Sequence, residues 1–246
     1  MNDFIGAVDF LLHERQSLGG AEIGGHHNLP LLQEHLYVSG ISILVAAAIA
    51  MPIGLVLAHF GRGQFLATSV ANIGRAVPSL ALLVFFAAYI GATRSNVVFA
   101  LILLAIPPIL TNTYVGVRQV ERDAVDAARG MGLGHARIMG QVELPLAVPL
   151  IVGGLRTSAV NVVATATIGP LAGSVTLGDA IINGGVYGFE GQLGGAIAVA
   201  LLAITTEAVF AAAQRAVTPR GTRLAMGSMA RRNPFLAPPK RKALSP

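Results

Sequence analysis

Asp123 and Asp126 are two carboxylates in a charged stretch that separates apolar segments of the chain. At a spacing of three residues they share one face of a helix, where they could hold a metal ion for a membrane-embedded transferase of the phospholipid type. Such a site needs more acids at helical spacing, and none follows Asp126 until Glu143. The sequence therefore predicts no catalytic residue, and a membrane enzyme is the weaker alternative.

Phosphate and metal chemistry have no better support elsewhere. The chain has no Gly-x-x-x-x-Gly-Lys-Ser/Thr loop to cradle phosphates, and the glycine-rich residues 129–134 lack the lysine and a preceding strand. His26 and His27 are adjacent in a glycine-rich loop with no matching cluster of carboxylates or cysteines, so we expect a solvated loop. The sequence predicts no metal and no cofactor bound by this chain.

A polar stripe is the remaining functional candidate. Thr157, Asn161 and Thr165 recur every fourth residue inside an apolar stretch and so share one helix face. Polar residues within membrane spans line pathways or bond neighbouring helices. Both interpretations stay open here: the stripe is either a wall of a translocation path or a set of helix-packing hydrogen bonds.

Composition indicates which elements position these residues. The 246 residues are 54% hydrophobic and only 12% charged, with a mean hydropathy of +0.68, whereas soluble domains carry about 25% charged residues. Several stretches reach the roughly 20 apolar residues that cross a bilayer as a helix. We therefore expect an all-α, polytopic membrane protein. The absence of cysteine excludes disulfides and thiol-ligated metals.

Hydropathy predicts about five spans. They cover residues 36–60, 64–91, 95–117, 144–168 and 191–213. Proline rings disturb helices, so we expect a kink at Pro52, an interruption of the second span at residues 74–78 and a break of the third at Pro107–Pro108.

The chain divides into three parts on this basis. Residues 1–35 lack a basic start and are expected to form a short amphipathic helix and a glycine- and histidine-rich linker, not a signal peptide. Residues 36–217 form the transmembrane domain, with a long loop at residues 118–145. Residues 218–246 form a basic tail.

The distribution of arginine predicts the orientation. The loop at 118–145 and the tail are rich in basic residues, whereas residues 170–190 contain no Lys or Arg. Because basic loops stay in the cytoplasm, we expect the loop and the C-terminus to be cytoplasmic and the N-terminus to be outside, with Arg15 and Arg94 as minor exceptions. The formal net charge of +5 comes from this tail and does not indicate a nucleic-acid partner.

The 118–145 loop has the composition of a short helix followed by a turn. In residues 121–129 the acids come early and an arginine comes last, which suits the helix dipole. We expect at least one of Gly130, Gly132 and Gly134 to supply the positive φ that ends the helix, and Pro145 to start the next helix. The small side chains of Ala127 and Ala128 would let the loop helix enter a groove on another protein.

Residues 124–132 (AVDAARGMG) and 142–149 (VELPLAVP) resemble the signature loop of the permease subunits of ABC importers, in particular the osmoprotectant branch. Residues 76–83 (AVPSLALL) and 154–160 (GLRTSAV) are similar to the second and fourth spans of that branch. Shorter similarities lie at residues 165–167, 177–179 and 218–221. Together the resemblance covers roughly residues 35–222.

The resemblance implies the fold of a type I ABC importer transmembrane domain with a cytoplasmic coupling helix, in a bacterial inner or plasma membrane. It implies import of glycine betaine, choline, carnitine or proline betaine by alternating access, with an amino acid such as methionine as the alternative cargo. The implied partners are an ATPase subunit that binds the ATP, a second permease subunit and an extracytoplasmic binding protein. High-affinity recognition falls to that binding protein, because the chain has 6% aromatic residues and no Trp for an aromatic cage.

The candidate site residues fall into three sets. The ATPase-coupling set comprises Asp126, Ala127, Ala128, Arg129, Gly130, Gly132, Val142, Leu144 and Pro145. The candidate translocation path comprises Pro78, Ser79, Thr157, Asn161 and Thr165. The candidate intramembrane charges are Arg75, Arg156 and Glu207. For these charges we favour structural pairing of Glu207 with an arginine, because a path lined by arginine suits a cationic solute poorly.

Two departures from the family pattern bear on these assignments. Asp126 stands where the family usually has Glu, and Val142 where it often has Ile; both changes keep charge or branching, so docking should survive. Residues 173–178 are poorer in glycine than the family's outer segment, which predicts a stiffer outer segment in this chain.

Overall fold

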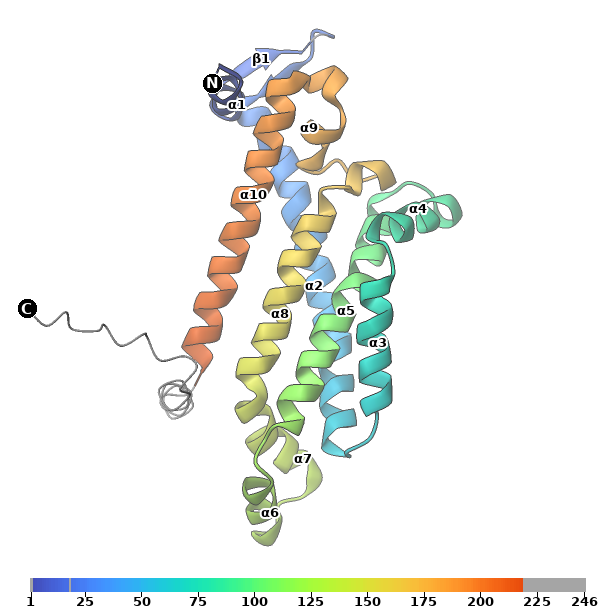
Figure 1. The fold of residues 1–246 in the computed structure, drawn as a ribbon, viewed down its shortest axis with the longest axis vertical. Coiled ribbons are helices and arrows are strands. Elements are labelled where there is room, and N and C mark those ends of the chain that lie inside the picture. Colours follow the sequence, from blue (N-terminus) through green and yellow to red (C-terminus); the bar gives the residue numbers. More distant parts are fainter. Residues whose placement is uncertain (1, 18, 219–246) are drawn as a thin grey trace, which may run out of the picture.

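The computed structural model describes residues 2–17 and 19–218, which form a long bundle of helices (Figure 1). The N-terminal part holds α1 (Asn2–Leu12), an antiparallel hairpin of β1 (Glu14–Gln16) and β2 (Glu22–Gly24), and a 3₁₀ turn, η1 (Gly25–His27). The sequence predicts a short helix and then a linker here, with a first span from residue 36. A short helix is present as α1, but the hairpin fills the linker and α2 begins at Asn28. The helix starts early because buried Leu31 and His35 extend its packed face beyond the apolar run.

Four long helices form the body of the bundle: α2 (Asn28–His59), α5 (Arg94–Arg118), α8 (Leu144–Ala166) and α10 (Gly184–Val217). Within the described residues, the four helical segments that contain them are long and apolar enough to cross a membrane. The shorter α3 (Gln64–Ala76) and α4 (Ser79–Ile90) make a fifth span when they are counted together. This agrees with the predicted count of about five.

The second span is broken. α3 and α4 meet at an angle of 86°, because Pro78 lacks an N–H and holds the preceding Val77 in an extended conformation (φ −75°, ψ 120°). With 13 residues, α3 rises only about 20 Å. It therefore does not cross the bilayer alone, and Figure 1 shows α4 turned across the bundle.

The predicted break at Pro107–Pro108 is wrong, because α5 runs without interruption through both prolines. A proline inside a helix frees the carbonyl four residues earlier, here those of Leu103 and Leu104. Leu104, Pro107 and Pro108 border a cavity. Pro107 is nevertheless buried, and a Cβ atom at Gly74 of α3 would overlap its ring, so α3 packs closely against this part of α5. α2 also runs as one helix through Pro52, and the kink expected there stays a prediction.

The fourth span extends further back than predicted. α8 does place Pro145 in its first turn, but a π-helical segment, η2 (Met139–Glu143), and α7 (His135–Ile138) precede it. The apolar helical stretch therefore begins at His135. The π segment lies where Pro145 cannot donate a backbone hydrogen bond, so the helix changes its hydrogen-bond register there and does not stop.

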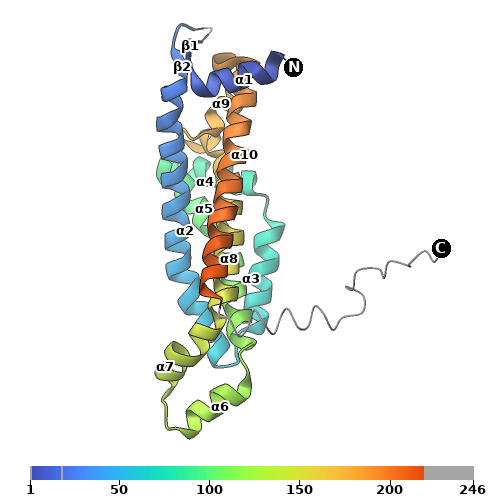
Figure 2. The ribbon, with the colours of Figure 1, turned by 90° about the vertical axis from the view of Figure 1, so that its left-hand side faces the viewer.

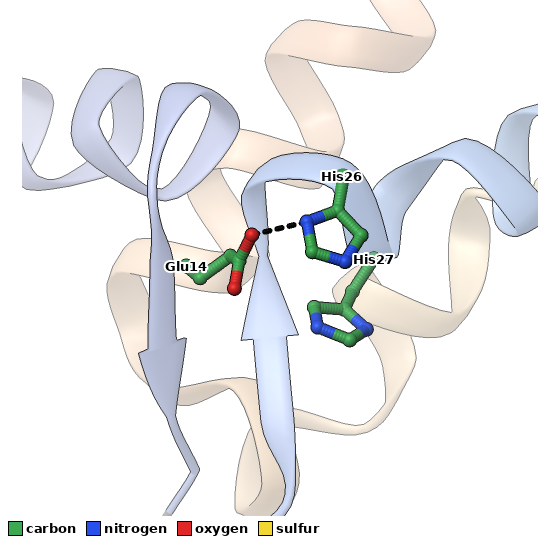
Figure 3. A group of neighbouring side chains, drawn as sticks. All are labelled: Glu14, His26 and His27. Atoms are coloured by element: carbon green, nitrogen blue, oxygen red, sulfur yellow. Dashed lines mark ion pairs between the residues drawn. The ribbon is translucent and has the colours of Figure 1, made fainter.

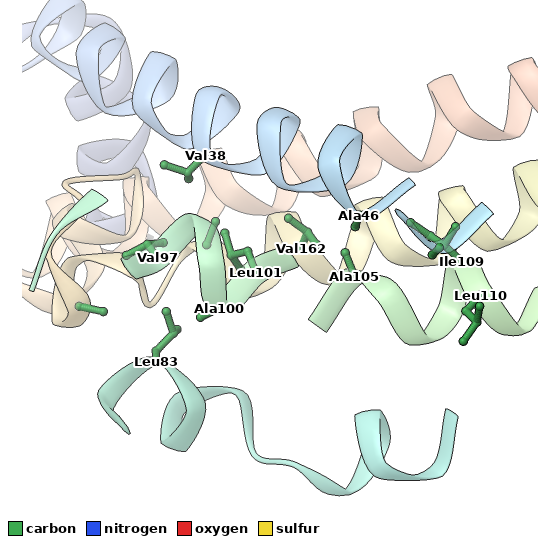
Figure 4. Packing of buried hydrophobic residues seen from close by; sticks show 13 residues of the cluster. Val38, Ala46, Leu83, Val97, Ala100, Leu101, Ala105, Ile109, Leu110 and Val162 are labelled. Carbon is green, nitrogen blue, oxygen red and sulfur yellow. The ribbon is translucent and has the colours of Figure 1, made fainter. Parts of the chain in front are cut away.

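The core lies where α2, α5 and α8 pack together (Figure 4). Its buried residues are mostly small or β-branched: Val38, Ala46 and Ala50 from α2, Val97, Ala100, Leu101, Ala105, Ile109 and Leu110 from α5, and Val162 and Ala166 from α8. Alanine lets the helix backbones approach closely, which favours association of apolar helices. Leu83 of α4 and Ala172 complete the cluster.

The bundle has two distinct ends (Figures 1 and 2). One carries α6 (Arg122–Gly130), α7 and the end of α10; the other carries α1, the hairpin and α9 (Gly178–Ile182). The predicted coupling loop and the predicted outer segment thus lie at opposite ends. We call the first the loop end and the second the hairpin end. The basic tail predicted for residues 218–246 lies outside the described residues except for Thr218.

Candidate functional site

The predicted loop helix is present as α6, one residue displaced from the predicted range. Its end is a Schellman motif: the N–H of Leu133 bonds to the Ala128 carbonyl at 3.1 Å, and that of Gly132 to the Arg129 carbonyl at 2.9 Å. Gly132 has φ +80°, which confirms that a glycine of this run supplies the positive φ. Arg129 also pairs with Asp126 at 3.2 Å on the exposed side of the helix.

The two alanines of the loop face different ways. Ala127 is exposed together with Asp126, whereas Ala128 is only 2% exposed. Ala128 therefore does not face a partner's groove, because α6 uses it to pack against its own chain at α7 and the π segment. The surface that remains free for another protein is the face with Asp123, Asp126 and Ala127.

Three polar side chains that the sequence did not connect join the loop to the first long helix. His59 ends α2, Glu143 lies in the π segment and His135 begins α7. His59 Nδ1 donates to Glu143 Oε2 at 2.6 Å, and His59 Nε2 lies 2.9 Å from His135 Nδ1. We call this the His59–Glu143–His135 network.

The network is closed to solvent at its centre. The side chains of His59 and Glu143 are 1% and 7% exposed, so each depends on the other for its hydrogen bonds. Beside the network, a cavity of about 330 Å³ reaches the base of α6 and is lined by Arg118, Arg122, Asp126 and Arg129, among others. α7 and the π segment, against which α6 packs, are thus anchored to α2 through buried polar contacts.

The polar stripe lines a cavity that we call the central cavity. This space of about 440 Å³ lies between α3, the start of α4, α5 and α8. Its polar lining comes from four predicted path residues and two others: Ser79, Thr157, Asn161, Thr165, Thr111 and Asn112. Pro78, the fifth predicted path residue, precedes Ser79 as the residue before α4.

One face of α8 packs against α5, and the other faces the cavity. On the buried face, the Ser158 hydroxyl donates to the Ala105 carbonyl of α5 at 3.1 Å. On the other face, Thr157 and Asn161 are exposed, and the Thr157 hydroxyl bonds to Gly153 of its own helix at 3.1 Å. The interhelical hydrogen bond thus belongs to Ser158, and the stripe faces the cavity.

Arg156 is neutralised by residues of α10. Its Nε donates to Glu207 Oε1 at 2.8 Å and its Nη1 to Gln214 Oε1 at 3.2 Å, while Gln214 Nε2 donates to the Pro149 carbonyl at 3.0 Å. These contacts tie α10 to α8. The side chain of Arg75 lies outside the part of the chain that the structure describes.

The segment before α9 is held by its own side chains. The buried Thr176 hydroxyl donates to the Ala166 carbonyl at 2.7 Å, and the Ser174 hydroxyl to Glu34 Oε1 at 2.7 Å. Gly173 has φ +102°, and at Gly178 a Cβ atom would overlap the Thr167 backbone. The segment is therefore closely fitted to the ends of α2 and α8.

The hairpin end holds a group of ionisable side chains. We expect no carboxylates beside His26 and His27, but the hairpin places Glu14 against His26 (Figure 3) and Glu22 against His27. The sequence could not show this, because Glu14 and His26 are 12 positions apart and the fold of the hairpin brings them together.

Comparison with known proteins gives a consistent picture. The family model described as "Binding-protein-dependent transport system inner membrane component" matches residues 50–223. The choline transport system permease protein OpuBB of Bacillus subtilis (strain 168) is 37% identical over 189 residues, which cover 76% of this chain and 87% of that protein. The glycine betaine/carnitine/choline transport system permease protein OpuCB of the same strain is 36% identical over 189 residues, with the same coverage.

A solved structure supports the fold. The chain is similar to a chain of the MetNI methionine ABC transporter in an inward-facing conformation, with a TM-score of 0.69 and 22% identity. The match covers 78% of this chain and 96% of that chain. This likeness confirms the predicted all-α membrane architecture of an ABC importer transmembrane domain.

Proposed function

The chain belongs to the family of binding-protein-dependent transport system inner membrane components, and from this premise we propose that it is the permease subunit of an ATP-driven importer for a quaternary-ammonium osmoprotectant. The proposed cargo is glycine betaine, choline, carnitine or proline betaine. The observation that carries this proposal is the 36–37% identity to permeases named for choline, glycine betaine and carnitine. Membership of a transport family also sets aside the membrane-embedded transferase.

The central cavity suits such a cargo. A quaternary ammonium group has no N–H to donate and needs a space without positive charge. Within the described lining there is no charged residue, and the hydroxyl and amide groups of the stripe can donate to a substrate carboxylate. The arginine nearest the stripe, Arg156, is paired with Glu207.

Energy enters at the loop end. The chain itself has no phosphate-binding loop, so we assign ATP binding to a separate subunit that docks on the exposed face of α6. When a pair of such ATPases closes, each would carry α6 with it, and the His59–Glu143–His135 network would pass that movement to α2. A second permease subunit and an extracytoplasmic binding protein complete the proposed importer.

The proposed orientation places the loop end in the cytoplasm and the hairpin end outside. It rests on the basic residues of the 118–145 loop and on the absence of Lys and Arg in residues 170–190. Because the chain lacks cysteine, single cysteines at exposed Gly134 and Val175 report the two ends cleanly. An impermeant thiol reagent applied to intact spheroplasts should label position 175 and spare position 134, and the reverse pattern would invert the orientation.

Uptake tests the cargo. Cells lacking their own betaine and choline uptake systems, with and without the complete importer, are given labelled glycine betaine, choline, carnitine and methionine. We expect uptake of at least one of the first three and none of methionine. Uptake of methionine alone would replace the osmoprotectant with an amino acid and leave the assignment as an importer intact.

A further inference from the structure

The hairpin at the N-terminus has one face turned to the protein and one turned away. In the β1–β2 register, Arg15 is opposite Ile23, Glu14 is opposite Gly24, and Gln16 is opposite Glu22. Ile23 is buried with Phe10 and Ala180. Because alternate residues of a strand point to opposite faces, Glu14 and Glu22 share the outward face of the hairpin.

Two glycines turn the chain back over that face. Gly24 and Gly25 have φ values of +81° and +48°, and a Cβ atom at Gly24 would lie 2.6 Å from the carbonyl oxygen of His13. At Gly25 a Cβ atom would lie 3.0 Å from the backbone nitrogen of Glu14. Larger residues would not fit this turn, which brings η1 with His26 and His27 against β1.

The side chains that meet there are all potential metal ligands. A His26 ring nitrogen contacts the Glu14 carboxylate, as the dashed line in Figure 3 shows, and the rings of His26 and His27 stack with centroids 4.2 Å apart. One ligand atom from each of Glu14, His26 and His27 lies within 4.8 Å of the other two. Three ligands thus converge from two elements of the chain.

The surroundings of His27 indicate that it binds something other than its ion-pair partners. Its Nε2 atom is buried and has no hydrogen-bond partner among the described residues, although Glu22 Oε2 lies 3.4 Å away. Exposed ion pairs alone leave such a buried nitrogen unsatisfied, whereas a metal ion would use it.

We propose that Glu14, His26 and His27 bind a divalent transition-metal ion such as Zn²⁺. Imidazole nitrogen and carboxylate oxygen are ligands that Zn²⁺ accepts, and three protein ligands leave the fourth position to water; the chain offers no thiolate. The ion joins β1 to the turn that precedes α2, so binding stiffens the hairpin end. The inference does not rest on the proposed cargo or on the orientation.

Metal binding to the purified full chain tests this site. The protein is produced without a polyhistidine tag, stripped with a chelator in detergent and titrated with Zn²⁺ by calorimetry. We expect one ion per chain, and a rise in the thermal midpoint of unfolding when the ion is added. Co²⁺ in its place should give the visible absorption bands of a tetrahedral N/O site.

Variants separate the site from general surface binding. His26→Ala and His27→Ala should each weaken Zn²⁺ binding by at least roughly tenfold and abolish the rise in midpoint. Glu14→Gln keeps the shape of the side chain and removes its negative charge, so it should weaken binding even if the alanine variants fold poorly. His13→Ala is the matched control, because His13 is an exposed histidine that pairs with Asp9 outside this group.

Some results would overturn the proposal. They are Zn²⁺ binding by His27→Ala equal to that of the unaltered chain, an equal loss in His13→Ala, or no saturable binding at one ion per chain. In any of these cases the side chains of Glu14, His26 and His27 form only surface ion pairs.

Discussion

Glycines at the two ends of the bundle have opposite surroundings. At the hairpin end, a Cβ atom at Gly173 or Gly178 would collide with the backbone of Ala92 or Thr167. At the loop end, a Cβ atom at Gly130, Gly132 or Gly134 would meet nothing within 4 Å. The segment that holds Gly173 and Gly178 is thus closely fitted to its own chain, whereas the glycine run of the loop is shaped by backbone conformation and leaves its surface free. A docking element needs that freedom, and a closely fitted segment cannot offer it.

The largest effect should come from filling the closed end. Gly178→Ala places a methyl group on the Thr167 backbone, and overpacking of this kind costs about 3 kcal/mol or more, because backbone atoms cannot give way as a side chain can. The thermal midpoint of the detergent-solubilised protein should fall sharply. Gly185→Ala is the control at the same end, because its Cβ atom meets nothing within 4 Å; an equal loss in both variants would contradict the contrast.

The His59–Glu143–His135 network is the closed part of the loop end and should give the next largest effect. His59→Ala removes the partner of the buried Glu143 carboxylate, which costs about 1–3 kcal/mol. His135→Ala should cost less, because His135 is exposed and contacts the outer nitrogen of His59. Thermal midpoints of the two variants, with ATPase retention measured in parallel, test this order of stability losses. A larger fall in midpoint for His135→Ala would show that His135, and not His59, contributes most to the network.

At the open end, a change of backbone preference should impair docking and leave folding intact. Gly132→Val forces a β-branched residue to φ +80°, at a cost of about 1–3 kcal/mol. The turn lies in open space, so in the free protein it can relax to another backbone conformation and the cost arises only when docking requires the original turn. Affinity for the ATPase subunit then falls by about 5–150-fold, and uptake falls with it. Gly134→Ala is the control, because Gly134 has φ −74° in open space.

Both variants should reach the membrane with an unchanged thermal midpoint. Normal uptake and normal ATPase retention by Gly132→Val would remove the Schellman turn from the coupling mechanism.

The smallest change in stability is expected in the central cavity, where the two faces of α8 repeat the contrast. Asn161→Leu removes a polar group at nearly constant volume on the exposed face. Uptake should fall while the thermal midpoint stays the same. Ser158→Ala, on the buried face, removes the hydrogen bond to Ala105. It should lower the free energy of unfolding by about 1 kcal/mol, and with it the thermal midpoint, while transport per folded complex stays unchanged. A lowered midpoint with unchanged transport in Asn161→Leu would assign the stripe to packing.

Local pattern predicted a large part of this molecule. The apolar runs predict the spans, because a backbone in lipid must form helices of a set length. The loop helix, a positive φ in its glycine run and the polar stripe with its four-residue period follow from periodicity and residue type. The start of α2 and the uninterrupted α5 could not be predicted in this way, because packing against neighbouring helices decides whether a helix extends or continues through a proline.

The sequence by itself thus determined the membrane class, the spans and the loop that resembles a coupling helix, because each depends on residues close together in the chain. Only the tertiary structure decided which charges and imidazoles meet. His59 and Glu143 are 84 positions apart, and Arg156 and Glu207 are 51 apart. It also turned Ala128 inward and brought Glu14 and Glu22 to His26 and His27. Contacts across such separations depend on how helices and strands pack, and the spacing of residues along one helix or strand does not encode that packing.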